Sequence, residues 1–114
     1  MIERGSVVWV DFGTPRGSEP AKRRPAVVLQ EDWLIESAIS TVIVVPMTSN
    51  LKLEVFPGNV RILALASGLD RDSVAVVSQV GPIDRGFLEP HPIGRLPGYL
   101  MTQVAGGVRL VTGI

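Results

Sequence analysis

The densest group of cations in the chain lies in the stretch "GSEPAKRRPAVVLQ", residues 17–30, where Lys22, Arg23 and Arg24 immediately precede Pro25 and an apolar run. Arginine binds a phosphate group through two parallel charge-assisted hydrogen bonds. A Thr or Ser hydroxyl beside such an arginine can hold a second oxygen of the same phosphate. These residue types suit the binding of a phosphodiester, although an arginine beside a strand is more often a solvated charge.

Most other chemistries lack the residues they need. His91 is the single histidine, so one chain cannot use two histidines as acid and base, and its flanking prolines favour an exposed loop. The chain has no cysteine, which excludes disulfides and thiolate metal sites. Asp70 and Asp72 are two positions apart, and turn capping is a better interpretation of them than a metal pair. The remaining set of arginine, hydroxyls and backbone suits RNA cleavage, because the substrate's own 2′-OH supplies the nucleophile.

Composition indicates one domain. The chain has 114 residues with 11 Lys+Arg and 11 Asp+Glu, so its net charge does not point to nucleic acid, whereas the local cluster does. No apolar run approaches the roughly 18 residues that span a membrane, and the start "MIERGSVVWV" lacks the pattern of a signal peptide. We therefore expect a cytoplasmic protein with no membrane partner.

The coarse pattern is that of short strands separated by turns. β-Branched and apolar runs predict strands at 7–12, 25–30, 41–48, 60–66 and 73–80, and the proline-rich and glycine-rich segment 13–24 predicts a loop. Residues 31–39 predict a short helix or an irregular excursion, and Pro46 predicts a bulge or the end of its strand. A helix is predicted from about 97 to 106, with its continuation past Gly106 and Gly107 left open. We expect a mainly β protein, a small twisted antiparallel barrel with a C-terminal helix.

Three segments resemble the MazF/PemK/Kid family of toxin endoribonucleases. They are "RGSVVWVDFGTPRGSEPAKRRPAVVLQ", "VVPMTSN" (44–50) and "LDRDSVAVVSQVGPIDRGFL" (69–88), in family order and at family-like spacing. The resemblance implies a single toxin domain over residues 1–114, an SH3-like or CcdB-like barrel and a homodimer. It also implies sequence-specific, ribosome-independent cleavage of single-stranded RNA without metal or other cofactor, giving 2′,3′-cyclic phosphate and 5′-OH ends. A cognate MazE-like antitoxin is the implied inhibitor.

The resemblance also assigns roles to residues. The catalytic arginine falls on Arg24 and the catalytic threonine on Thr48. The residues implied to contact RNA are Ser18, Glu19 and Lys22 in the first loop, Arg23 beside the catalytic arginine, Asn50 and Phe56 in the second loop, and Gln79. Several of these have plain structural alternatives: Arg23 as a solvated charge, Phe56 as a core residue and Gln79 as a polar strand end. Trp9 is expected to pack rather than stack on a base, and Asp72 and Ser73 to serve structure.

The chain departs from the family pattern in its histidines, and two alternative functions remain open. Some family members have a histidine beside the catalytic arginine or in the first loop, and this chain has Arg23 and no loop histidine. The same barrel also serves CcdB-like gyrase-binding toxins and could serve a non-catalytic RNA-binding or protein-binding module. The RNA sequence that is cut and the class of RNA cannot be deduced from these loops.

Overall fold

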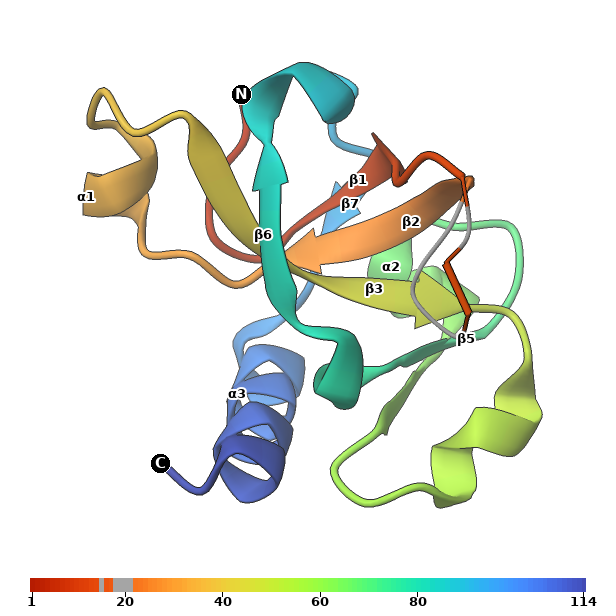
Figure 1. The fold of residues 1–114 in the computed structure, drawn as a ribbon. Coiled ribbons are helices and arrows are strands. Elements are labelled where there is room, and N and C mark those ends of the chain that lie inside the picture. The colour runs from red at the N-terminus through yellow and green to blue at the C-terminus, as the bar shows by residue number, and fades with distance from the viewer. Residues whose placement is uncertain (15, 18–21) are drawn as a thin grey trace.

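The computed structural model describes residues 1–14, 16–17 and 22–114, and its centre is a curled antiparallel sheet (Figure 1). Six strands lie in the order β4-β5-β3-β2-β1-β7, and β6 pairs with β3 off this path. The strands are β1 (Ser6–Asp11), β2 (Arg23–Val28), β3 (Thr41–Thr48), β4 (Val60–Ile62), β5 (Ser73–Ala75), β6 (Gly81–Asp84) and β7 (Gly94–Arg95). The helices are α1 (Asp32–Ile35), α2 (Ala64–Ser67) and α3 (Gly98–Thr112), with 3-10 turns η1 (Leu51–Val55), η2 (Val77–Gln79) and η3 (Arg85–Phe87). The predicted mainly β, antiparallel fold with a C-terminal helix is confirmed.

Alternation along the central strands creates two cores, one on each face of the sheet. Val7, Val27 and Val45 point to the face that α3 covers, where Leu100 and Val104 meet them. The residues next to these valines in the chain point to the opposite face of the sheet and pack with Ile35 and Leu88. Because a strand places successive side chains on opposite faces, "VVWV" and "AVV" can be apolar throughout only in a sheet buried on both sides.

Pro46 neither ends β3 nor forms a bulge there, contrary to the sequence prediction. It pairs with Ala26 of β2, and its carbonyl accepts a hydrogen bond from the Val76 backbone N–H at 2.9 Å. In a strand the N–H and C=O of one residue point to the same side, so the missing N–H faces the edge that carries Val76. Along that edge β3 pairs first with β6 and then with β5, and Pro46 lies between the two pairings. No backbone N–H is needed there for a hydrogen bond between strands, so a proline is tolerated.

Two of the five predicted strands are shorter than expected. The run 60–66 is a strand only to Ile62, because the Asp72 carboxylate accepts a hydrogen bond from the Ala64 N–H at 2.9 Å and α2 starts there. The run 73–80 leaves the ladder after Ala75 and turns into η2. Asp72 therefore serves structure, as expected, but its carboxylate binds the first N–H of α2 and no bond to the turn before β5 is seen among the described residues.

The sequence pattern predicted neither β6 nor β7, and it left open how far α3 continues past Gly106 and Gly107. The pair Gly81-Pro82 is typical of turns, yet it begins β6, which lies on an edge where Pro82 is tolerated opposite Ile43. Helix α3 continues through both glycines to Thr112, because Gly107 packs directly on the turn at Gly58. No helix in the described ranges has the length and apolarity required to cross a membrane.

Candidate functional site

Arg24 and Thr48 lie at the ends of neighbouring strands and line the same pocket. The pairing of β2 with β3 ends at Ala26 and Pro46, and Arg24 and Thr48 each lie two residues beyond that pair, where β2 still pairs with β1 and β3 pairs with β5. Since both positions are an even number of residues from that pair, their side chains belong to the same face of the sheet. Figure 1 shows the start of β2, the end of β3 and β5 together on the right-hand side of the molecule.

A pocket of about 420 Å³ opens at this end of the sheet. Its lining side chains come from β1 and β2 (Trp9, Arg23, Arg24, Pro25), from the end of β3 (Met47, Thr48, Ser49) and from the segment leading into β5 (Leu69, Asp70, Arg71, Ser73). Three stretches that are distant in the chain therefore build one concave surface, with arginines and hydroxyls on an apolar floor.

The hydroxyl of Thr48 is oriented by its own loop. Its Oγ1 accepts a hydrogen bond from the Asn50 backbone N–H at 3.1 Å, and the side-chain oxygen of Asn50 accepts one from the Lys52 N–H at 3.2 Å. A hydroxyl that accepts in this way keeps its O–H donor for another partner. Thr48 is half-buried in the pocket wall, so that donor is suited to an anionic oxygen.

The backbone of Arg24 is fixed on both sides. Arg24 pairs with Val10 of β1, and the next residue, Pro25, pairs with Trp9 and has a ring-locked φ. Arg24 is half-buried, whereas Arg23 is exposed. A guanidinium on a rigid strand is aimed before a ligand arrives, which is what preorganised charge stabilisation requires.

Arg23 is held by Trp9, which lines the pocket, and by Glu89, which lies outside the pocket lining. Its guanidinium carbon lies 4.2 Å from the ring centroid of Trp9, a cation–π contact. Its Nε donates to Glu89 Oε2 at 2.5 Å and its Nη2 donates to Glu89 Oε1 at 3.1 Å. The hydrogen bond from Arg23 holds the pKa of Glu89 below its usual range, and the same bond raises the pKa of Arg23.

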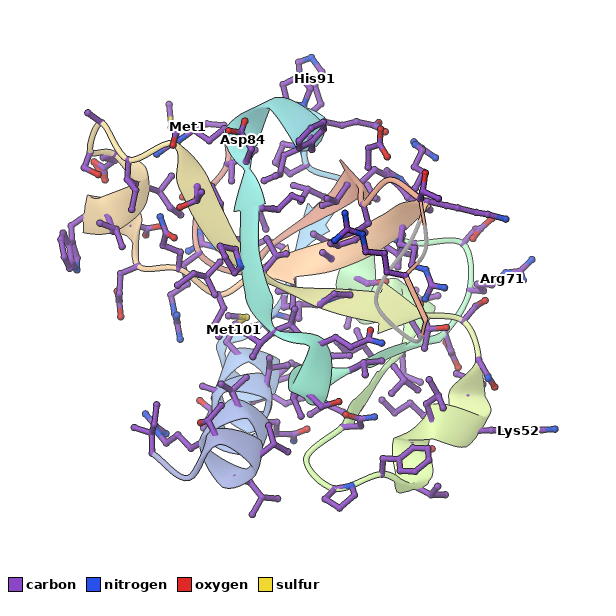
Figure 2. All side chains as sticks on the ribbon, viewed as in Figure 1. Met1, Lys52, Arg71, Asp84, His91 and Met101 are labelled. Carbon is purple, nitrogen blue, oxygen red and sulfur yellow. The ribbon has the colours of Figure 1, made fainter. Side chains whose placement is uncertain are left out.

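The third wall of the pocket comes from residues 69–73. Arg71 lies there on the exposed turn before β5, and Figure 2 shows its side chain extending outward at the same end of the molecule. The turn is fixed by Asp72, which caps α2, and by the pairing of Ser73 with Ile62. The pocket rim therefore carries cations on two sides.

The structure brings together some of the predicted site residues. Arg23, Arg24 and Thr48 line the pocket, and Lys22 lies directly before β2, where its N–H donates to the Gly13 carbonyl at 2.6 Å. The side chain of Asn50, next to Thr48, caps η1 through its oxygen.

The remaining predicted residues lie elsewhere. Phe56 is 57% exposed and so is not a core residue, and it is outside the pocket lining. Gln79 is half-buried in η2, also outside that lining. Ser18 and Glu19 lie outside the described residues.

Sequence reasoning missed the contributions of Glu89 and Arg71 and undervalued Trp9. Trp9 is half-buried and lines the pocket under Arg23, so its role is more than core packing. Its position opposite Pro25 could have indicated this, because a hairpin places residues around "RRP" beside the first strand. Glu89 carried no signal, since it reaches Arg23 from 66 residues away in the chain. Across the described ranges, no group of three or more His, Asp or Glu side chains could hold a metal ion.

The arrangement can bind an anionic group from several directions. Arg24 and Arg23 supply guanidinium donors, Thr48 supplies an O–H donor, and the partly exposed apolar side chains of Pro25 and Leu69 can contact a base or a sugar. An anionic group such as a phosphate fits these donors better than a small neutral ligand does.

Comparison with known proteins places this fold and pocket in a family. A family model described as "PemK-like, MazF-like toxin of type II toxin-antitoxin system" matches residues 3–112. Endoribonuclease MazF6 of Mycobacterium tuberculosis is 40% identical over 111 residues, covering 97% of this chain and 96% of that protein. Endoribonuclease EndoA of Bacillus subtilis is 35% identical over 105 residues, covering 91% and 88%. The crystal structure of MazF from Deinococcus radiodurans superposes with a TM-score of 0.82 at 23% identity, covering 99% and 97% of the two chains. The chain belongs to the PemK-like, MazF-like toxin family of type II toxin–antitoxin systems.

Proposed function

We propose that the protein is a sequence-specific, ribosome-independent endoribonuclease toxin that cleaves single-stranded RNA without a metal or other cofactor. The observation that carries the proposal is that Arg24 and Thr48, from neighbouring strands, line one pocket. The relatives named endoribonuclease, at 40% and 35% identity over nearly the whole chain, support the assignment of this pocket to RNA cleavage.

In the proposed reaction the 2′-oxygen of the substrate attacks the adjacent phosphorus atom. The bond from phosphorus to the 2′-oxygen forms as the bond to the 5′-oxygen breaks, the 2′-OH proton passes to solvent, and the leaving 5′-oxygen takes up a proton. The products are a 2′,3′-cyclic phosphate and a 5′-OH. Arg24 stabilises the charge that develops on the phosphorane oxygens, and Thr48 donates its O–H to a non-bridging oxygen. Electrostatic stabilisation is the main role of Arg24, since a guanidinium stays protonated in proteins and is a poor base.

RNA contacts beyond the scissile phosphate are proposed for the rest of the groove. Lys22 and Arg23 adjoin Arg24 in the chain and supply positive charge for flanking phosphates. Asn50 lies two residues after Thr48, and Phe56 is exposed on the same connection, where it can stack on an unpaired base. Ser18, Glu19 and Gln79 complete the proposed set through the family resemblance.

Residues 1–114 are proposed to act as one toxin domain, in the cytoplasm and as a homodimer, with a cognate MazE-like antitoxin as inhibitor. The family model spans residues 3–112, which supports a single unit. Structural neighbours include MazE–MazF assemblies from Deinococcus radiodurans, which support an antitoxin partner. The absence of cysteine and the RNA substrate favour the cytoplasm.

The test is digestion of a mixed pool of RNA in EDTA, followed by mapping of 5′-OH ends. The wild type is expected to cut at a short motif, and Arg24→Ala is expected to lose cleavage by about a hundredfold or more, as for the removal of one preorganised donor. Thr48→Val keeps the side-chain shape and removes the O–H, and it is expected to lose cleavage to a similar degree.

The matched control is Arg109→Ala, which removes one exposed arginine from α3 without touching the pocket. It is expected to cleave as the wild type does. Unchanged cleavage by Arg24→Ala with a native circular dichroism spectrum would refute the mechanism. Inhibition of gyrase supercoiling by a wild type that leaves RNA intact would instead identify the CcdB-like alternative.

A further inference from the structure

The pairing of Arg23 with Glu89 fixes one edge of a guanidinium and leaves the other edge available. Arginine has five N–H donors in a planar fork. Glu89 engages one on Nε and one on Nη2, at 2.5 Å and 3.1 Å. The edge formed by Nη1 and the second hydrogen of Nη2 keeps the parallel geometry that matches two oxygens of a phosphate.

Trp9 fixes the plane of the same guanidinium. The guanidinium carbon lies 4.2 Å from the centroid of the indole, so the group stacks on the ring instead of swinging through solvent. The Glu89 N–H also donates to the Trp9 carbonyl at 2.9 Å, which ties the carboxylate to the strand that carries the ring. A carboxylate at one edge and an aromatic face below together restrict an otherwise flexible side chain.

This arrangement is poorly explained as a stabilising ion pair. The Arg23 and Glu89 side chains are 57% and 47% exposed, and ion pairs at that exposure contribute little to folding. Both Arg23 and Trp9 line the pocket that holds Arg24 and Thr48. The restriction is therefore placed where it affects a ligand.

We propose that Glu89 and Trp9 are positioning residues that aim the second edge of the Arg23 guanidinium at an RNA phosphate next to the one held by Arg24 and Thr48. The inference rests on the proposed function for the identity of the ligand. It assigns Arg23 a fixed place in the groove instead of a generic positive charge, and it gives the acidic Glu89 a role that favours binding of a polyanion.

The sign of the Glu89→Gln effect separates this role from simple charge balance. If Glu89 only neutralised Arg23, its removal would free positive charge, and RNA would bind more tightly. If Glu89 aims Arg23, its removal weakens binding, because the guanidinium becomes free to rotate and pays ordering entropy when it meets the phosphate. The matched control is Glu3→Gln, since Glu3 pairs with Arg95 at 2.9 Å with similar exposures of 43% and 60%, outside the pocket.

The experiment measures binding of a labelled, mixed-sequence, 2′-O-methylated RNA pool by fluorescence anisotropy over a range of salt concentrations. The methylated pool lacks the nucleophile and is not cut. We expect Arg23→Ala to weaken binding about tenfold and to reduce the slope of log affinity against log salt by about 0.7, the value for one phosphate of a single strand. We expect Glu89→Gln to weaken binding about threefold to fivefold in the wild type and to have no effect in the Arg23→Ala background. Trp9→Leu is expected to weaken binding in the same direction, and Glu3→Gln to leave it unchanged.

The outcomes distinguish this inference from the proposed function. Tighter binding by Glu89→Gln, or an equal effect of Glu89→Gln with and without Arg23, would overturn the positioning role while cleavage by the wild type still supports the nuclease. Binding with the expected pattern by a protein that never cleaves would refute the nuclease and leave the positioning role standing. Failure of the wild type to bind the pool would overturn the inference.

Discussion

Two adjacent glycines in α3 are predicted to respond in opposite directions to the same substitution. A Cβ on Gly107 would lie 2.1 Å from the carbonyl oxygen of Gly58 and 3.0 Å from Cγ1 of Val77, whereas a Cβ on Gly106 meets nothing within 4 Å. Real Cβ atoms do not approach a backbone oxygen so closely, so Gly107→Ala must push α3 away from the turn at Gly58. That turn cannot yield easily, because Gly58 has a φ of +79° and is itself pressed on the helix.

The magnitudes follow from packing and helix propensity. Overpacking of this kind costs about 3 kcal/mol at the upper end of the usual range, and the replacement of a helical glycine by alanine returns about 1 kcal/mol. Gly107→Ala should therefore lower the free energy of unfolding by about 2 kcal/mol. Gly106→Ala has no clash and should raise it by about 1 kcal/mol. The two variants should differ in Tm by about 12 °C, at about 4 °C per kcal/mol for a domain of this size.

The assay is urea and thermal unfolding of both variants, with unfolding monitored by circular dichroism. A Gly107→Ala protein that is as stable as Gly106→Ala would show that the helix does not approach the 56–59 turn as described. A lower stability for both would show that the end of α3 needs glycine for a reason other than this contact.

Two further predictions concern hydrogen-bonded side chains. Glu89 should have a pKa below the usual glutamate range because Arg23 donates hydrogen bonds to it, so the pair's contribution to stability is present above the unfolded-state pKa and is lost as pH falls through the lower folded-state pKa. NMR titration of the Glu89 carboxyl checks this prediction, and Arg23→Ala should return the pKa of Glu89 toward its usual value. Gln30 is 4% exposed, accepts from the Ile43 N–H at 3.0 Å and donates to the Thr41 carbonyl at 3.3 Å, so Gln30→Leu should cost about 1–3 kcal/mol by urea unfolding. The same substitution at exposed Gln103 should be close to neutral, and equal effects at the two sites would contradict the bonded role.

The sequence predicted the parts of the fold that depend on local pattern. Residues 41–48 form β3 over the predicted range, because an apolar run of that length with β-branched residues suits a central strand. The second strand was predicted at residues 25–30, and β2 covers Arg23–Val28, so Pro25 is its third residue and Arg24 lies within the strand. Arg24 and Thr48 came from resemblance, and the register gives them a physical reason to be near each other.

The parts that could not be predicted depend on tertiary partners. Residues 60–66 looked like a strand, and only the distant Asp72 carboxylate decides that a helix starts at Ala64. Gly81-Pro82 is a turn signal that becomes an edge strand because β3 is available beside it. Glu89 is invisible as a site residue until the fold brings it to Arg23. In each case a long-range contact outweighed a local preference.

The pocket exists only as tertiary structure, because its walls come from residues 23–25, 47–49 and 69–73. An unfolded chain contains every proposed catalytic side chain and yet has no place where two of them meet. Pairings between distant strands form late and slowly, since loop-closure entropy opposes them. Loss of the β2–β3 pairing alone would separate Arg24 from Thr48 while leaving α3 helical. If Arg24 and Thr48 act together as proposed, RNA cleavage depends on the pairing of β2 with β3 and can report on the integrity of that pairing in conditions where the helix content does not change.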